Sequence, residues 1–484
     1  MSLANQNPSV KYHFDPSFKA TALGGMALWQ QAARKLGLYR ALAQYVPDPG
    51  AQTLAVQLAA GLSLGGHGQA AADLIHQDTQ VGRLLGLDRG VGPKRVHPTL
   101  VKMAGRSLRT RDKAYKPIGC PRSTRSAGWK RIRTESEPAT PEALASIRLV
   151  NFALLRRAFA LIPKQELKIG DFYCGFLDGS LLETKAVSGD LAAKDRKGNQ
   201  SVLLMGFWLG PLLLAFDLYP GNTEEGSVAL DLIQRGLRAI DDLGIPREQF
   251  LLLADSAYGQ GHIIPALKDS QVNYILGMNR HRRYLTQKVR EFHPGYWKTT
   301  STPARNHRSE EFCLFTYRAQ EWHSNVDILA ARYLADGELI PQTSFLTSNL
   351  TPEHVGKLPA SCQGDSLFSS LWLTYARKQQ CENFQKDFLS DLGMHHPSSS
   401  RTCVNQVLYE IAQLALTIGV FVSRTLLTKP FHNARLWRIA RTFYTISACL
   451  ASHGRTLFLR LSTAPAHFIQ AAWTRAMEKL ASLR

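Results

Sequence analysis

The chain has 484 residues, of which 44% are hydrophobic, so it can bury a large core divided into two or three domains. Its 58 Lys and Arg against 38 Asp and Glu give a net charge of +20. That excess favours a polyanionic partner, nucleic acid first and an anionic membrane second, with a merely basic soluble protein as the alternative. Seven cysteines without CxxC spacing indicate neither a zinc ribbon nor a disulfide framework. The N-terminus has no apolar signal-peptide core, so we expect a cytoplasmic protein.

Residues 1–104 are predicted to form a helical N-terminal domain that binds DNA. Apolar residues recur at helical spacing in ALWQQAARKLGLYRALAQYV and QTLAVQLAAGLSL. Residues 81–106 could form a helix-turn-helix, although an ordinary small helical domain has the same pattern. Residues 105–164 are predicted to be a basic linker and a helix. Within them, residues 106–133 contain Asp112 as their only acid, which indicates either an arm along phosphates or a solvated loop.

Residues 165–284 are predicted to be the first part of an RNase H-like core. The strand candidates DFYCGFLDGSLLET, SVLLMGFWLG and LLLAFDLYPGN come first, the last two joined by a turn at Gly210–Pro211. A helix, a short buried strand, a short helix and another strand follow, from TEEGSVALDL to VNYILGMN. The order β-β-β-α-β-α-β is that of the RNase H-like fold, so the predicted fold class is α/β.

The rest of the chain is predicted to interrupt and then complete this core. Residues 285–368 carry strand-like pieces and form a β-rich insertion, residues 369–425 are the second part of the core, and residues 426–484 form a basic helical C-terminal region. The apolar segment LALTIGVFV, residues 414–422, is too short to span a bilayer and is predicted to be a buried helix, so we expect no membrane partner.

Asp178 and Asp255 occupy equivalent places, each at the C-terminal end of an apolar run, in GFLDGS and LLLADSAYG. Ligand sites gather at strand ends in open α/β sheets. Two carboxylates brought together there repel each other unless a divalent cation lies between them. The alternative is structural: Asp178 could begin a turn, and Asp255 with Ser256 could cap a helix near His262. Asp190 is predicted to be a loop residue.

A third acid lies in LWLTYARKQQCENFQKDFLSDLG. Tyr375, Lys378, Glu382 and Lys386 are spaced 3, 4 and 4 residues apart and share one face of a predicted helix, with Phe384 on the opposite side. A carboxylate flanked by cations and a phenol could complete a metal site. The alternative is a ladder of surface ion pairs worth ~0.2–0.5 kcal/mol each.

These motifs together resemble a DDE transposase. D-G-S after one strand, A-D-S-A-Y-G after a later one, and Y-x₂-K-x₃-E on a helix beyond a β insertion are similar to bacterial insertion-sequence transposases with a Y-x₂-R-x₃-E-x₆-K signature. The resemblance covers about residues 20–460 and includes LYPGNTEEG, similar to the loop after the third strand. It implies that Asp178, Asp255 and Glu382 are the catalytic, metal-binding residues.

The resemblance also assigns residues to DNA. It implies that Tyr375, Arg377, Lys378 and Lys386 contact DNA. Lys378 stands where the signature has Arg, and Leu389 stands where it has Lys, so Lys386 is the candidate substitute. In some relatives a flipped base stacks on a tryptophan of the insertion. Trp297 and Trp322 lie in that region, and a core position is the alternative for each.

The function implied is a DNA transposase that binds the terminal inverted repeats of a mobile element, cleaves phosphodiesters and transfers 3′ ends to target DNA. Two Mg²⁺ ions per active site, or Mn²⁺ in their place, would serve the reaction. The expected partner is double-stranded DNA, of the element ends and of the target, bound by a homodimer at the nucleoid in the cytoplasm. The alternatives are a decayed or repurposed DNA-binding protein and a structure-selective Mg²⁺-dependent nuclease of the same fold.

Overall fold

A computed structural model describes the chain in ten segments, residues 20–87, 90–107, 138–184, 193–279, 283–299, 310–318, 325–333, 342–453, 456–463 and 465–483. Three predictions fall outside the described residues. They are most of the basic arm, from residue 108 to 133, the loop position Asp190, and Trp322 as a stacking platform.

The central sheet has the strand order expected of an RNase H-like core, β6-β5-β3-β7-β8. Its strands are β3 (Phe172–Glu183), β5 (Gln200–Leu209), β6 (Leu212–Pro220), β7 (Phe250–Ala254) and β8 (Asn273–Met278). Strand β5 pairs antiparallel with both β3 and β6, whereas β3, β7 and β8 run parallel to one another. Two short strands, β2 (Lys168–Ile169) and β4 (Ala193–Lys194), pair with β3 and β5. The predicted α/β fold class is confirmed.

Helices cover both faces of this sheet because successive side chains of a strand point to opposite sides. On β5, Phe207 lies against Gly236 of α8 (Glu225–Asp242), while its neighbour Trp208 packs its ring near Phe384 of α13 (Gln379–Lys386). The short α9 (Ile263–Asp269) connects β7 to β8.

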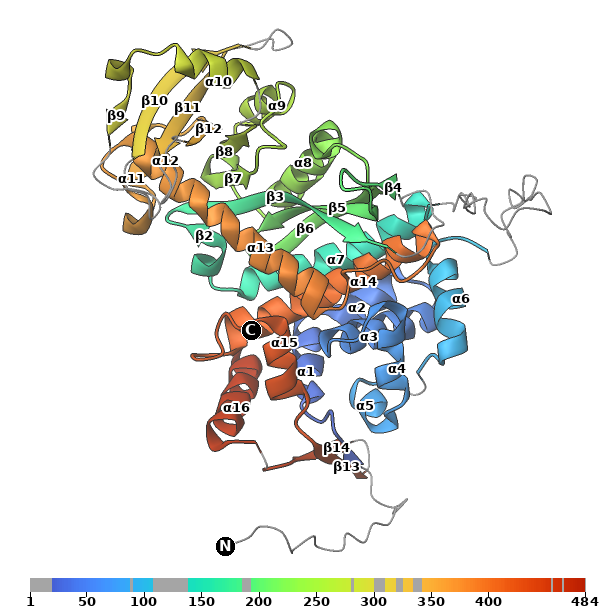
Figure 1. Cartoon of the computed structure of the whole chain (residues 1–484). Coiled ribbons are helices and arrows are strands. Elements are labelled where there is room, and N and C mark those ends of the chain that lie inside the picture. Colours follow the sequence, from blue (N-terminus) through green and yellow to red (C-terminus); the bar gives the residue numbers. More distant parts are fainter. Residues whose placement is uncertain are drawn as a thin grey trace, which may run out of the picture.

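The helix that crosses the second face is built from four consecutive pieces. They are α12 (Leu367–Tyr375), the 3₁₀ turn η6 (Ala376–Lys378), α13, and the π-helical turn η7 (Asp387–Asp391). Figure 1 shows α12 and α13 as one orange rod that runs obliquely across β3 and β5. The rod therefore spans the middle of the sheet.

The β insertion extends the central sheet. Strand β12 pairs antiparallel with β8, and the order then continues through β11 and β10 to β9. The elements of the insertion are α10 (Arg283–Arg290), β9 (Lys298–Thr299), β10 (Glu310–Tyr317), β11 (Val326–Tyr333), β12 (Gln342–Ser348) and, after it, α11 (Pro352–Gly356). One continuous sheet therefore joins the core and the insertion.

The N-terminal helices surround one buried helix, α14 (Thr402–Phe421), which contacts α1, α3, α7 and β6. These helices are α1 (Met26–Leu36), α2 (Leu38–Tyr45), α3 (Pro49–Ser63), α4 (Ala71–His76), α5 (Thr79–Leu84), α6 (Pro93–Met103) and α7 (Pro141–Leu161). The segment Thr402–Leu426 is long and apolar enough to cross a bilayer, but 94% of its apolar window is buried inside the protein. It is a core helix, as predicted.

The two ends of the described chain meet in a small sheet. Strand β1 (Ala20–Thr21) pairs with β13 (Ala448–His453), which pairs with β14 (Thr456–Leu461). The helical pieces of the C-terminal region are η8 (Val422–Leu426), α15 (Leu436–Ile439), η9 (Ala440–Tyr444) and α16 (His467–Ser482), and α16 packs on α1. The sequence predicted helix throughout residues 426–484 and so did not predict the β13–β14 hairpin, and the pairing of β1 with β13 joins residues more than 400 positions apart.

The two helices of the candidate helix-turn-helix are present, but the short turn is not. Helix α5 ends at Leu84 and α6 begins at Pro93, whereas the motif joins its helices through about 3–4 residues. The intervening loop is fixed to α3, since Gln57 accepts a hydrogen bond from the Val91 amide at 2.7 Å and donates to the Val91 carbonyl at 3.0 Å. The pair therefore packs as part of the helical bundle.

Candidate active site

Asp178 lies inside β3, not at its end as the apolar pattern suggested. The strand continues to Glu183 because β5 pairs with it over its whole second half. The neighbour that ends here is β7, whose last paired residue, Ala254, lies opposite Leu177. Because neighbouring strands lie about 4.8 Å apart, the parallel register places Asp178 beside Asp255, the residue that follows Ala254.

Asp178 is buried against a cation. The residue is 6% exposed, and its Oδ1 lies 3.0 Å from Nζ of Lys378 on η6. Burial raises the pKa of Asp178, the Lys378 charge lowers it, and Asp255 raises it again, with a net upward shift. Burial alone would lower the pKa of Lys378, but Asp178 and Asp255 outweigh burial and raise it. The ion pair therefore links β3 to the helix that crosses the sheet.

Asp255 shapes the turn that follows β7. Its Oδ1 accepts a hydrogen bond from the Ala257 amide at 2.8 Å. Helix α9 begins at Ile263, and its N-cap residue, His262, makes no side-chain cap hydrogen bond. The helix-cap alternative for Asp255 is therefore wrong, and a local turn role accompanies its place beside Asp178.

Glu225 is a third acid at the site that the sequence did not single out. It begins α8, in the loop LYPGNTEEG, and its Oε2 accepts a hydrogen bond from the Tyr258 hydroxyl at 2.5 Å. A Cβ placed on Gly179 would lie 2.6 Å from its carboxyl carbon, so only glycine leaves room for this acid beside Asp178. Burial raises the pKa of Glu225, the Tyr258 hydrogen bond lowers it, and Asp255 and Asp178 raise it, with a net upward shift.

The acids reach this point from different sides of the sheet. Phe176, Asp178 and Ser180 alternate onto the face covered by α13, whereas Gly179 faces the N-terminal end of α8 and Glu225. Within the described segments, no three His, Cys, Asp or Glu side chains lie close enough together to hold a metal ion. The arrangement is a partly buried acidic site with one resident cation, Lys378.

Glu382 lies on α13 beyond Lys378, and its side chain is exposed. At about 100° per residue, Gln385 lies almost on the same helix face as Lys378, seven residues earlier, and Glu382 lies about 60° around the helix from Gln385. Gln385 faces the sheet, where it accepts a hydrogen bond from the Ser180 hydroxyl at 3.0 Å. The structure brings Asp178, Asp255 and Lys378 together, and the metal role of Glu382 stays a prediction.

The residues assigned to DNA contacts are dispersed along the same helix. The Tyr375 hydroxyl lies beside Gly277, where a Cβ would be 2.5 Å away, at the end of β8 next to Asp255. Arg377 donates to Ser361 Oγ at 2.7 Å, and Lys386 is exposed. Leu389, at the signature's lysine position, packs against the hydrophobic core.

Trp297 occupies a core position. It is 8% exposed, and the Arg332 guanidinium lies 4.3 Å from the centre of its ring. One face of the ring is therefore covered by a cation, which favours the core alternative over a platform for a flipped base.

Comparison with known proteins relates the chain to transposases. Residues 204–484 match a family model described as Transposase DDE domain, group 1, a match that includes Asp255, Glu225, Lys378 and Glu382 but begins after Asp178. A search of curated proteins found no match. Among solved structures, the chain is similar to a piggyBac transposase in a synaptic complex with hairpin DNA, solved by cryo-EM. The TM-score is 0.36 and the identity 10%, and the match covers 62% of this chain and 55% of that one.

Proposed function

Because the chain belongs to the DDE transposase family, we propose that it is a DNA transposase. It binds the terminal inverted repeats of a mobile element, cleaves phosphodiesters there and transfers the 3′ ends to target DNA. The observation that carries the proposal is the β3–β7 register, which sets Asp178 beside Asp255 at the point where β7 ends.

The predicted metal ligands are of the chemical type that binds divalent cations. Asp178, Asp255 and the exposed Glu382 offer carboxylate oxygens, the ligands that Mg²⁺ and Mn²⁺ prefer. Burial and the neighbouring acids raise the pKa values of Asp178 and Glu225, and a cation bound beside them would lower these pKa values again. We propose that the three predicted residues hold two Mg²⁺ or Mn²⁺ ions. When bound, the ions would lower the pKa of an attacking water or 3′-hydroxyl and stabilise the leaving oxygen.

The protein's own residues position the DNA. We propose that Lys378 neutralises Asp178 before metal binding. Once metal is bound, the Lys378 ammonium group contacts a DNA phosphate instead. Tyr375, Arg377 and Lys386 extend this contact along the helix. The partner is double-stranded DNA, the bound form is a homodimer that pairs two element ends, and the site of action is the nucleoid in the cytoplasm.

The experiment is a nicking and strand-transfer assay with Mg²⁺ and a labelled duplex carrying the terminal repeat found beside the gene. We expect Asp178→Asn and Asp255→Asn to lower cleavage by at least about 10²–10³-fold while DNA binding persists, since each removes a charged ligand. Asp269→Asn is the matched control, because Asp269 is an exposed acid on α9. Equal cleavage by wild type and by Asp178→Asn would disprove the proposal.

A second candidate, a DNA-binding protein without catalysis, is favoured by two observations. Leu389 packs on the core where the signature has a lysine, and Glu382 is outside any metal-sized cluster of described residues. Wild-type protein that binds the terminal repeat but leaves every strand intact with Mg²⁺ or Mn²⁺ would identify this function. Cleavage of branched DNA lacking the repeat, without strand transfer, would identify the structure-selective nuclease.

A further inference from the structure

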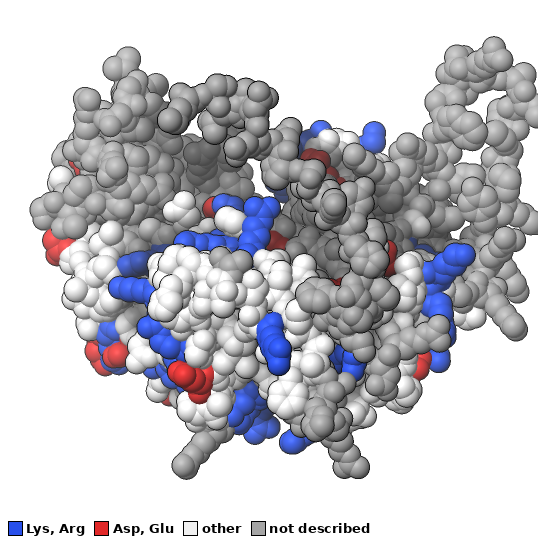
Figure 2. Space-filling view, turned by 90° about the horizontal axis from the view of Figure 1, so that it is seen from below, with Lys and Arg blue, Asp and Glu red and all other residues white. Residues whose placement is uncertain are grey.

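The C-terminal region contains a long stretch without acids. Between Glu410 and Glu478 the sequence has eight Lys and Arg and no Asp or Glu. Figure 2, which views the molecule from below the orientation of Figure 1, shows Lys and Arg side chains scattered over the described part of this face and few Asp and Glu. Arg424 and Arg435 pair with acids from other parts of the chain, and the remaining cations give the region a positive potential that attracts polyanions.

Two arginines of this stretch, Arg438 on α15 and Arg441 on η9, lie against aromatic rings. The Arg441 guanidinium lies 5.5 Å from the ring centre of Trp437, which is 47% exposed. Arg438 lies 5.5 Å from the ring of Phe431, and Phe431 stacks on the exposed Phe468. No ion pair between described residues includes Arg438 or Arg441, and both are exposed. Their charges are held in place by rings and face solvent.

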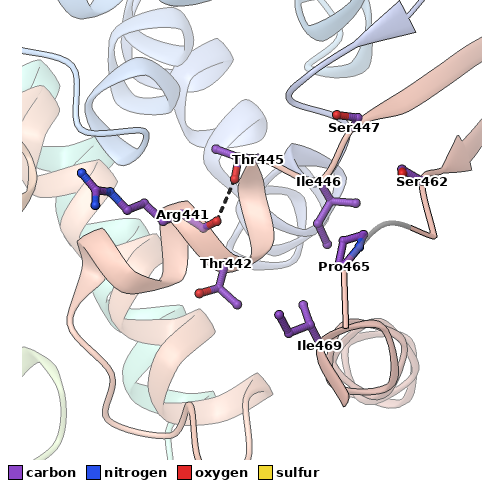
Figure 3. Close-up of a pocket in the computed structure, with 8 residues that line it drawn as sticks. All are labelled: Arg441, Thr442, Thr445, Ile446, Ser447, Ser462, Pro465 and Ile469. Carbon is purple, nitrogen blue, oxygen red and sulfur yellow. Dashed lines mark hydrogen bonds between the residues drawn. The ribbon is translucent and has the colours of Figure 1, made fainter. Parts of the chain in front are cut away.

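A pocket of about 390 Å³ opens beside these side chains. Figure 3 shows Arg441 extending away from the pocket, whose wall includes the hydroxyl side chains of Thr442, Ser447 and Ser462. No acid lines the pocket. Hydroxyl side chains such as these, like the Arg441 guanidinium on the outer side, are donors that bind phosphate oxygens in nucleic-acid complexes.

An ion cluster joins this surface to the helix of the active site. The Arg435 guanidinium contacts Asp391 at 2.6 and 3.1 Å and also contacts Asp387, and the Trp437 amide donates to Asp391 at 3.2 Å. Asp387 and Asp391 belong to η7, which continues α13. Trp437 and its neighbours are therefore fixed relative to the helix that carries Lys378 and Gln385.

We propose that Trp437, Arg438 and Arg441 form a DNA-backbone surface, here called the arginine–aromatic surface, aligned with the active site by the Arg435–Asp391 cluster. The proposal rests on the proposed function and adds a second place where the DNA is held. A second copy of the chain fits the surface poorly. A two-fold contact through it would set the arginines of both copies against each other, and like charges across an interface are costly.

The test is the salt dependence of DNA binding, measured by fluorescence anisotropy with a fluorescein-labelled duplex of arbitrary sequence over a KCl series. The affinity depends on salt through the number of phosphates neutralised. We expect Arg438→Ala/Arg441→Ala to reduce the slope of log K against log [KCl] by about 2. Trp437→Ala should weaken binding about two- to fivefold and leave the slope unchanged, because the ring orients Arg441 but carries no charge.

Lys268→Ala/Arg290→Ala is the matched control. It removes two exposed cations from α9 and α10, at the opposite end of the molecule from α15 and α16 (Figure 1), and should leave the slope as in wild type. An unchanged slope in Arg438→Ala/Arg441→Ala, or an equal fall in the control, would overturn the proposal. So would a change of oligomeric state in sedimentation without DNA and without a change of slope, since that identifies a protein interface.

The two proposals fail separately. If wild type shows the expected slope and the double variant reduces it, the surface stands even when Mg²⁺ produces no nick. If wild type nicks its terminal repeat but the double variant binds like wild type, the catalytic proposal stands and the surface is wrong. Thermal unfolding of each variant checks that the exposed substitutions leave the fold intact.

Discussion

At the scale of single residues, Glu225 is the acid that lies beside Asp178 and that the sequence did not single out. It approaches Asp178 across Gly179, and its carboxylate receives a 2.5 Å hydrogen bond from Tyr258. Burial raises the pKa of Glu225 and of Tyr258, so the hydroxyl stays protonated and donates while the carboxyl favours its neutral form. The hydrogen bond from Tyr258 lowers the pKa of Glu225 and so favours its ionised form.

We expect Tyr258→Phe to move the acidic limb of the cleavage pH–rate profile to higher pH. The hydrogen bond lowers the pKa of Glu225, so its loss raises that pKa, and a higher pH is needed to ionise the acid. Tyr296→Phe is the control, since Tyr296 is 67% exposed in the insertion. A lower rate with an unmoved limb would show that Tyr258 is only structural.

A second residue-scale prediction concerns Gly277 on β8. A Cβ there would lie 2.5 Å from the Tyr375 hydroxyl and 2.8 Å from the Ser256 amide nitrogen. We expect Gly277→Ala to lower the free energy of unfolding by about 1–3 kcal/mol in urea titrations and to displace Tyr375. Gly356→Ala, where a Cβ meets nothing within 4 Å, should change it by less than about 1 kcal/mol. Equal effects would contradict the close approach of Tyr375.

At the scale of elements, the π-helical turn η7, which continues α13, is joined to the C-terminal region by Asp387 and Asp391, since both contact Arg435. Burial and the hydrogen bond to Asp391 raise the pKa of Asp387 from 3.8 to about 7, against the lowering effect of Arg435. The folded protein therefore holds more protons than the unfolded chain between these two values. Stability from this group is present at low pH and is lost as the pH rises toward 7.

We expect Asp387→Asn to flatten that pH dependence. The free energy of unfolding of wild type should fall between about pH 4 and pH 7, and the variant should lack this fall because its amide does not titrate. Urea titrations at several pH values measure the difference. Asp242→Asn, at an exposed acid of α8, should keep the wild-type dependence. If the unfolding free energy of Asp387→Asn falls with pH as that of wild type does, another group causes the pH dependence.

At the scale of the whole molecule, the N-terminal helices and the catalytic sheet share one hydrophobic core and a buried polar network. Glu410 of α14 is 2% exposed and accepts hydrogen bonds from Arg148 at 2.7 Å and from Asn151 at 2.9 Å, both on α7. Arg148 also contacts Asp217 of β6 at 3.0 Å. The network fastens the helical bundle to the edge of the sheet.

We expect Glu410→Ala to cost about 3–5 kcal/mol of unfolding free energy, because it leaves Arg148 and Asn151 without their buried partner. Glu353→Ala removes an exposed acid whose pair with Lys357 is 3.4 Å long, and it should cost less than about 0.5 kcal/mol. Urea denaturation compares the two. A small loss for Glu410→Ala would mean that apolar packing alone joins the bundle to the sheet.

The sequence by itself determined the elements that depend on local patterns. Apolar runs and turn residues predicted the strand and helix order of the core, the β insertion and the buried helix around residues 414–422. The resemblance carried by D-G-S, A-D-S-A-Y-G and Y-x₂-K-x₃-E led to the DDE transposase family. Periodicity and motif spacing are properties of the chain, so they can be read without coordinates.

Only the tertiary structure decided which side chains meet. Parallel pairing of β3 with β7 set Asp178 beside Asp255, and Lys378 reached Asp178 while Glu382 on the following helix stayed exposed. Glu225 joined the site because Gly179 leaves space across a strand 46 residues earlier in the chain. The pairing of β1 with β13 likewise joins segments from opposite ends of the sequence. Such contacts depend on register, helix phase and long-range packing, which local patterns do not encode.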